Sequence, residues 1–234
     1  MNIHMIDIHP DWNLLMRWAS NNGLFFSEQK NCMDSGYVIH AWMKAMFNDR
    51  APFVFRELRS RSGLRILGYS NHDRKSMMEY AEMFATPETY SVLDKDSIYS
   101  KAMPSFTGRI GFDCLAAPVV RKADGREIDV WEFSRKNGEE KSRQEVYAEW
   151  LIKHFNVDGA HISGIGITSR KTVKRMRKTQ SNGVEPRKIE WITVPDVEFT
   201  GNMHIETPDA FEKVLKGIGR HKAFGYGMVL VRPA

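Results

Sequence analysis

Apolar and polar residues alternate along the chain with two different periods, and each change of period marks a predicted element. A period of two predicts a first strand at residues 4–9, with the sequence HMIDIH. The same period at 53–58 and 64–70 predicts two more strands, and the intervening RSRSG predicts that they form a hairpin. Residues 10–23 carry apolar side chains at helical spacing and end in Asn-Asn-Gly, which is typical of a helix terminus.

Two further helices are predicted in the first half from their capping residues. Asp34 or Ser35 can cap a helix over 36–47, because a short side-chain oxygen accepts an amide hydrogen bond at that position. Asp73 caps a clearly amphipathic helix over 73–85. The first half therefore reads strand, helix, strand, strand, helix, strand, with an extra helix before the first one.

The second half repeats this order. Its predicted strands and helices lie at 107–121, 142–155, 160–169, 189–205, 207–217 and 227–233. A strand–helix–strand–strand–helix–strand unit is the ferredoxin-like arrangement. The predicted fold class is therefore α+β, with two tandem ferredoxin-like (βαββαβ) domains at 1–100 and 105–234 and a break within 95–107.

Positive charge gathers in one place. The formal net charge is +5, but the segment RKTVKRMRK at 170–178 holds six cations and no acid. Because such a cluster repels itself, it indicates a polyanionic partner such as nucleic acid, with a solvated basic helix face as the alternative. At helical spacings the cations would line one side and form the candidate RNA-binding set: Arg170, Lys171, Lys174, Arg175, Arg177 and Lys178.

Composition excludes several classes. No apolar run approaches the ~20 residues that span a bilayer, so no membrane partner is expected. The N-terminus lacks the pattern of a signal peptide. Cys32 and Cys114 are the two cysteines, and their separation suggests neither a disulfide framework nor a zinc site. We expect a reducing, cytoplasmic location.

A glycine-rich loop, GIGRHKAFGYG at 217–227, precedes the last predicted strand. It follows a helix and leads into a strand, the reverse of a dinucleotide-binding turn, and it lacks Gly-Lys-Ser/Thr, so no small-molecule cofactor is predicted. Its amides and basic side chains can face a phosphate, whereas a crowded turn that needs glycine is the alternative. The candidate RNA contacts are Gly217, Gly219, Arg220, His221, Lys222, Gly225 and Gly227.

The segment 208–233 resembles the C-terminal signature of the CRISPR repeat-processing endoribonucleases, most closely the CasE type of the type I-E Cascade complex. That signature reads Gly-apolar-Gly-x-x-Lys-Ala-apolar-Gly-apolar-Gly, as in the loop here. The segments 146–155 and 197–211 resemble the same family, so the resemblance covers most of 105–234 well and the N-terminal half loosely. In CLAAPVVR, Leu115 and Ala117 stand where the family often has Arg and Asn.

The resemblance implies RNA cleavage without a metal, in which a 2′-OH attacks its own 3′-phosphate. The family's Tyr-x-x-His pair matches Tyr37 and His40 in DSGYVIHAW, and these residues would share a helix face. Histidine suits proton transfer near neutral pH. The implied substrate is a CRISPR repeat RNA hairpin, the implied partners are other Cascade subunits, and no cofactor is implied.

Other interpretations remain open at this point. The protein can be a module that holds a hairpin without cutting it, an alternative that the departures in CLAAPVVR keep open. A small-molecule enzyme is disfavoured by the basic charge and the missing cofactor fingerprint. Asp7 and His9 would share a strand face while His4 points away, which makes a poor metal site. Arg56, Arg59 and Arg61 around the first hairpin are secondary RNA-binding candidates.

Overall fold

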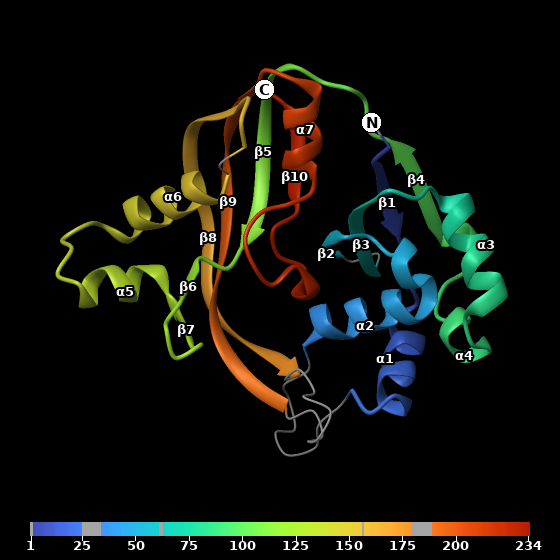
Figure 1. Ribbon diagram of the computed structural model, residues 1–234. Coiled ribbons are helices and arrows are strands. Elements are labelled where there is room, and N and C mark those ends of the chain that lie inside the picture. Colours follow the sequence, from blue (N-terminus) through green and yellow to red (C-terminus); the bar gives the residue numbers. More distant parts are fainter. Residues whose placement is uncertain (1, 25–33, 61–62, 156, 179–188) are drawn as a thin grey trace.

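The computed structural model describes residues 2–24, 34–60, 63–155, 157–178 and 189–234. Two four-stranded antiparallel sheets organise them, with the strand orders β2-β3-β1-β4 and β10-β5-β9-β8. In each sheet the first and third strands of the unit lie at the centre and the second and fourth at the edges (Figure 1). This is the ferredoxin-like order, so the predicted α+β fold with two tandem ferredoxin-like units is confirmed.

The period of two predicts three strands of the first sheet, which are β1 (His4–Ile8), β2 (Val54–Ser60) and β3 (Gly63–Ser70). The fourth strand, β4 (Ile98–Ala102), lies inside the segment 95–107, where the break between the two halves is expected. The first half also contains α1 (Trp12–Asn21), α2 (Ser35–Phe47), α3 (Arg74–Phe84), the short α4 (Pro87–Tyr90), and the 3₁₀ turns η1 (Asn48–Arg50) and η2 (Lys95–Ser97). The three longer helices each begin after an aspartate whose side chain accepts a first-turn amide, namely Asp11, Asp34 and Asp73.

The second sheet carries more insertions than the sequence predicted. Its elements are β5 (Gly108–Ala116), α6 (Arg143–His154), β8 (Ala160–Lys178), β9 (Ile189–Ile205), α7 (Pro208–Leu215), the 3₁₀ turn η3 (Lys222–Phe224) and β10 (Val229–Pro233). The predicted strand at 107–121 is broken after Ala116, because Pro118 has no amide hydrogen to donate to a ladder. A small hairpin of β6 (Val119–Arg121) and β7 (Glu127–Asp129) follows and leads into α5 (Val130–Lys136).

The basic segment 170–178 is a strand, which corrects the expected helical alignment. β8 pairs with β9 without interruption from Ser169 opposite Glu198 to Lys178 opposite Ile189. Neighbouring residues of a strand point to opposite faces, so Arg170 and Lys174 lie on one face of β8 while Lys171 and Arg175 lie on the other, and these four cations do not form one stripe. The length of β8 depends on its pairing with β9. A sequence pattern within β8 alone does not contain this information.

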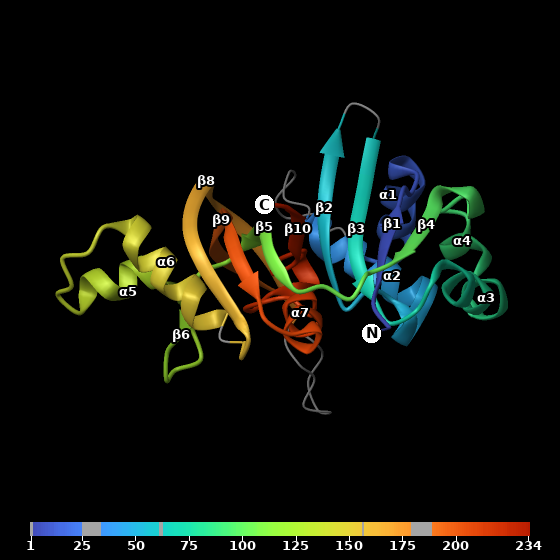
Figure 2. The same ribbon diagram turned by 90° about the horizontal axis from the view of Figure 1, so that it is seen from above.

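The two halves share a hydrophobic core. Ile6 and Ile8 of β1 pack with the helices of the first half, whereas Ile3, directly before β1, is buried with residues of the second half. Tyr69 of β3 also faces the second half, and its buried hydroxyl donates to the Val229 carbonyl at 3.0 Å. Figure 2 shows the two halves side by side along the molecule. In the described ranges no helix has the length and apolar character needed to cross a membrane.

Candidate functional site

The first turn of α2 lies directly against the glycine-rich loop. A β-carbon added at Gly36 would lie 2.4 Å from the carbonyl oxygen of Phe224 in η3, so only glycine permits this approach. The ring of Tyr37 is tilted against the ring of Phe224, with 6.2 Å between their centroids. Figure 1 shows α2 beside the red loop that precedes β10. The fold therefore brings the region near residue 40 together with the region near residue 220.

His40 and Tyr37 lie one turn apart on α2, and both side chains are half-buried. Burial lowers the pKa of His40 from its usual value, and the nearby cation of Lys44 lowers it further. Both causes disfavour the charged ring. The imidazole is therefore suited to accept a proton from a hydroxyl near neutral pH.

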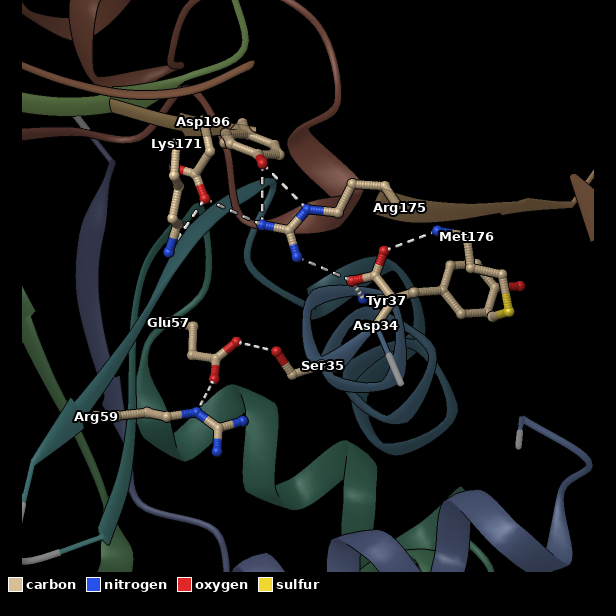
Figure 3. Close-up of polar contacts among 10 residues, drawn as sticks. Asp34, Ser35, Tyr37, Glu57, Arg59, Lys171, Arg175, Met176 and Asp196 are labelled. Atoms are coloured by element: carbon tan, nitrogen blue, oxygen red, sulfur yellow. Dashed lines mark hydrogen bonds and ion pairs between the residues drawn. The ribbon is translucent and has the colours of Figure 1, made fainter. Parts of the chain in front are cut away.

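Asp34, directly before α2, anchors this helix to the second half of the chain. Its Oδ1 accepts from the Tyr37 amide at 3.2 Å, and its Oδ2 accepts from the Met176 amide of β8 at 2.9 Å. The guanidinium of Arg175 donates to Asp34 Oδ1 at 3.3 Å and lies 3.6 Å from Asp196 Oδ2 (Figure 3). A buried carboxylate, a largely buried guanidinium and two main-chain amides thus meet at the start of α2.

The four glycines of the loop all have positive φ and approach protein atoms closely. A β-carbon at Gly227 would lie 2.1 Å from the Ile218 carbonyl oxygen, and one at Gly217 would lie 2.9 Å from a Val54 methyl. Gly219 faces Trp150 and Gly225 faces Phe55 at ordinary to tight contact distances. The loop is therefore the crowded turn that the sequence left open as an alternative, and it packs against both halves of the chain.

The basic side chains of the loop bind protein groups. Arg220 Nε lies 2.9 Å from one oxygen of Glu127, and His221 Nε2 lies 2.7 Å from the other. Lys222 Nζ donates to the carbonyls of Lys216 and Gly217 at 2.7 and 3.0 Å and so caps the C-terminus of α7. Burial lowers the pKa of Lys222. These contacts give all three side chains a structural task beside any contact with phosphate.

The cations of the β8 segment differ in exposure. Arg170, Lys171 and Lys174 are exposed, and Lys171 Nζ lies 3.5 Å from Asp196. Arg175 is turned inward, with 16% of its side chain exposed, and donates twice to the Tyr226 hydroxyl, at 2.9 and 3.0 Å. The side chains of the two remaining predicted cations lie outside the described residues, namely Arg177 and Lys178.

The secondary arginine candidates of the first hairpin form ion pairs. Arg56 is buried and pairs with Glu198 of β9, which joins the two halves. Arg59 pairs with Glu57 and lies 4.1 Å from the centre of the Trp12 ring. Glu57 in turn accepts a 2.5 Å hydrogen bond from Ser35 at the start of α2 (Figure 3). Arg61 lies outside the described residues.

The aspartate of β1 is engaged by protein partners. Asp7 forms a bidentate pair with Arg65, at 2.9 and 2.7 Å, and lies 3.0 Å from His9 Nε2. Among the residues that the structure describes, no cluster of three or more His, Cys, Asp or Glu side chains has the proximity to hold a metal ion.

Sequence analysis missed several groups that shape this site. Glu127 contacts Arg220 and His221 of the loop, Asp196 pairs with the inward-turned Arg175 of β8, and Phe224 packs on Tyr37. Glu127 and Asp196 carried no signal, because an acid in a strand is usually solvent-exposed. Asp34 carried a signal as a helix cap but none for its second role, since its partner Arg175 is 141 residues away.

Solved structures share this fold along the full chain. The CRISPR endoribonuclease Cse3 bound to 19 nt RNA superposes with a TM-score of 0.61 at 17% identity, over 99% of each chain. Thermus thermophilus Cse3, bound to an RNA representing a pre-cleavage complex, gives 0.59 at 17% identity over 100% of each chain. The CRISPR-associated protein Cas6e from Escherichia coli K-12 gives 0.54 at 14% identity, over 99% of this chain and 100% of that one. At these identities the similarity concerns the fold.

Sequence comparison supplies the family. No curated protein sequence matches the chain significantly. A family model described as CRISPR associated protein matches residues 13–233, which is nearly the whole chain and includes α2, the β8–β9 hairpin and the glycine-rich loop. The chain belongs to the CRISPR-associated protein family.

Proposed function

We propose that this protein is an endoribonuclease of the CasE type that binds CRISPR repeat hairpins and cuts precursor CRISPR RNA on the 3′ side of each hairpin. The observation that carries the proposal is the contact of Gly36 and Tyr37, in the first turn of α2, with the glycine-rich loop; His40 lies one turn farther along the same helix. The family match and the RNA-bound Cse3 structures of the same fold support it.

The proposed reaction is an internal transesterification that needs no metal. The 2′ oxygen attacks the adjacent phosphorus, the bond from phosphorus to the 5′ oxygen breaks, and the products are a 2′,3′-cyclic phosphate and a 5′-OH. One proton leaves the 2′-OH and one is delivered to the departing oxygen. His40 carries one of these transfers, and its lowered pKa favours the neutral ring that accepts a proton. Tyr37 orients the phosphate or the 2′-OH.

The RNA-binding surface that we propose centres on β8. Arg170, Lys171 and Lys174 offer exposed positive charge on this long hairpin, and the same hairpin contacts Asp34 at the start of α2. A-form RNA is recognised mainly through phosphates and shape, for which such a strand is suited. By resemblance to its family, the protein stays on the processed RNA and joins other Cascade subunits in the cytoplasm.

The test is incubation with the repeat RNA transcribed from the CRISPR array next to the gene, in EDTA. We expect a single cut at the 3′ base of the hairpin, with a 2′,3′-cyclic phosphate on the upstream product. RNA that is bound tightly but stays intact would support the non-cleaving hairpin holder instead. RNA that is neither bound nor cut would overturn both functions.

A further inference from the structure

We propose that Asp34 is a positioning residue: it fixes the candidate catalytic helix α2 to the RNA-holding hairpin β8–β9 and so sets Tyr37 and His40 against the scissile phosphate. This inference rests on the proposed function and adds to it a residue that touches no RNA. It is carried by contacts that join α2, β8 and the glycine-rich loop around one buried carboxylate.

The carboxylate of Asp34 is shared between two elements. On its own helix it accepts from the Tyr37 amide at 3.2 Å, and across the domain boundary it accepts from the Met176 amide of β8 at 2.9 Å. Its side chain is 0% exposed, so neither bond competes with bulk water. A shift of β8 along its length would therefore pull on the helix cap and, three residues later, on Tyr37.

Arg175 extends this link to the loop. Its guanidinium bridges Asp34 and Asp196 of β9 (Figure 3). It also donates to the hydroxyl of Tyr226, a fully buried residue of the glycine-rich loop. The planar guanidinium sets the directions of these bonds, so it holds the three elements in one geometry. These are α2, which bears the proposed proton-transfer residue, the β8–β9 hairpin, whose strand β8 bears the proposed RNA-binding charge, and the glycine-rich loop beside Tyr37.

An aspartate that only caps a helix needs no contact with the other half of the chain, such as those that Asp34 makes with Met176 and Arg175. Asp73 caps α3 by accepting from the Ser76 amide at 2.8 Å, and Asp11 caps α1 by accepting from Leu14 at 2.9 Å. In the described part of the chain, neither of these two carboxylates makes a hydrogen bond or ion pair to the second half. Burial raises the pKa of Asp34 because it disfavours the charged carboxylate, whereas Arg175 and the main-chain amides favour the carboxylate and lower the pKa. Asp73 is therefore a matched control with the same capping chemistry and no cross-domain bond.

The experiment compares Asp34→Asn with Asp73→Asn in the full chain. Asparagine still caps a helix, so both substitutions preserve the first turn, but only Asp34→Asn removes the charge opposite Arg175. Two quantities are measured with the repeat RNA: the single-turnover cleavage rate constant at saturating protein, and the Kd for a hairpin with a 2′-deoxy nucleotide at the cut site. A misplacement of about 1 Å in an active site can lower the rate by a factor on the order of 100.

We expect Asp34→Asn to lower the cleavage rate constant by roughly 10- to 100-fold while the Kd stays within about twofold. Asp73→Asn should change neither quantity. Arg175→Lys serves as a second variant that keeps the positive charge but loses the planar geometry, and it should give the same split if Asp34→Asn does not fold.

Three outcomes would overturn the inference, and they differ in what else they affect. If the unsubstituted protein cleaves and both Asp34→Asn and Arg175→Lys cleave as fast as Asp73→Asn, only the positioning role is lost. The same holds if the Kd weakens in proportion to the rate. If the unsubstituted protein leaves the RNA intact, the proposed function fails and the positioning role fails with it.

Discussion

At the scale of single residues, His40 differs from an ordinary exposed histidine in a way that can be measured before any RNA is added. Burial and the cation of Lys44 both disfavour the imidazolium, so the pKa lies below the usual value for histidine. His40 should therefore lose its proton at a lower pH than an exposed histidine. Lys44→Gln removes one of the two causes and should raise this pKa.

The measurement is an NMR titration of the ring of His40 in the free protein. Lys75→Gln is the matched control, because Lys75 is an exposed lysine on α3 and should leave the His40 titration unchanged. A His40 pKa at or above the usual ~6.5 in the unsubstituted protein would contradict this picture of the site.

The glycine-rich loop makes a second residue-scale prediction. Gly227 and Gly138 have nearly equal φ, 83° and 82°, but only Gly227 has atoms in the way of a β-carbon. Gly138→Ala should thus cost about 1 kcal/mol of unfolding free energy, from backbone strain alone. Gly227→Ala should cost roughly 3 kcal/mol or more, because the Ile218 carbonyl must also move. Urea denaturation of both variants checks this, and equal losses would show that packing at Gly227 is unimportant.

At the scale of elements, the β8 strand divides its cations between RNA and protein. Lys174 is exposed, whereas Arg175 is held by Asp34, Asp196 and Tyr226. If Lys174 contacts one phosphate, Lys174→Gln should reduce the slope of log affinity against log salt by about 0.7–0.9. Filter binding from low to moderate salt measures this slope. Lys75→Gln should leave it unchanged, and an unchanged slope for Lys174→Gln would remove Lys174 from the RNA contacts.

The sequence predicts those features of the helices and strands that depend on neighbouring residues, but not those that depend on distant ones. The caps Asp34 and Asp73, the first hairpin and the fold class follow from local chemistry and periodicity, and they are found in the structure. The extension of β8 through the basic segment is fixed by its pairing with β9. The inward turn of Arg175 depends on Asp34, which is 141 residues away. No window of sequence contains both partners, so the structure was needed to separate this cation from its neighbours.

At the scale of the whole molecule, the halves are joined by both packing and polar contacts. Ile3 and Tyr69 of the first half are buried in the core of the second, and Arg56 pairs with Glu198 across the boundary. The loop glycines bring Val54 and Phe55 of β2 against the second half as well. These contacts between the two halves hold α2 and the glycine-rich loop in one arrangement. A site that is shared between two halves requires such rigidity.

The most direct test of the account is the single-turnover cleavage of the repeat RNA by His40→Ala in EDTA, with hairpin binding measured in parallel. Loss of a group that transfers a proton should slow cleavage by about 100- to 10,000-fold. The Kd for the hairpin should stay within about twofold, since His40 is not among the cations of β8. Cleavage by His40→Ala at the rate of the unsubstituted protein would contradict the account, because the contact between α2 and the glycine-rich loop would then have no catalytic role.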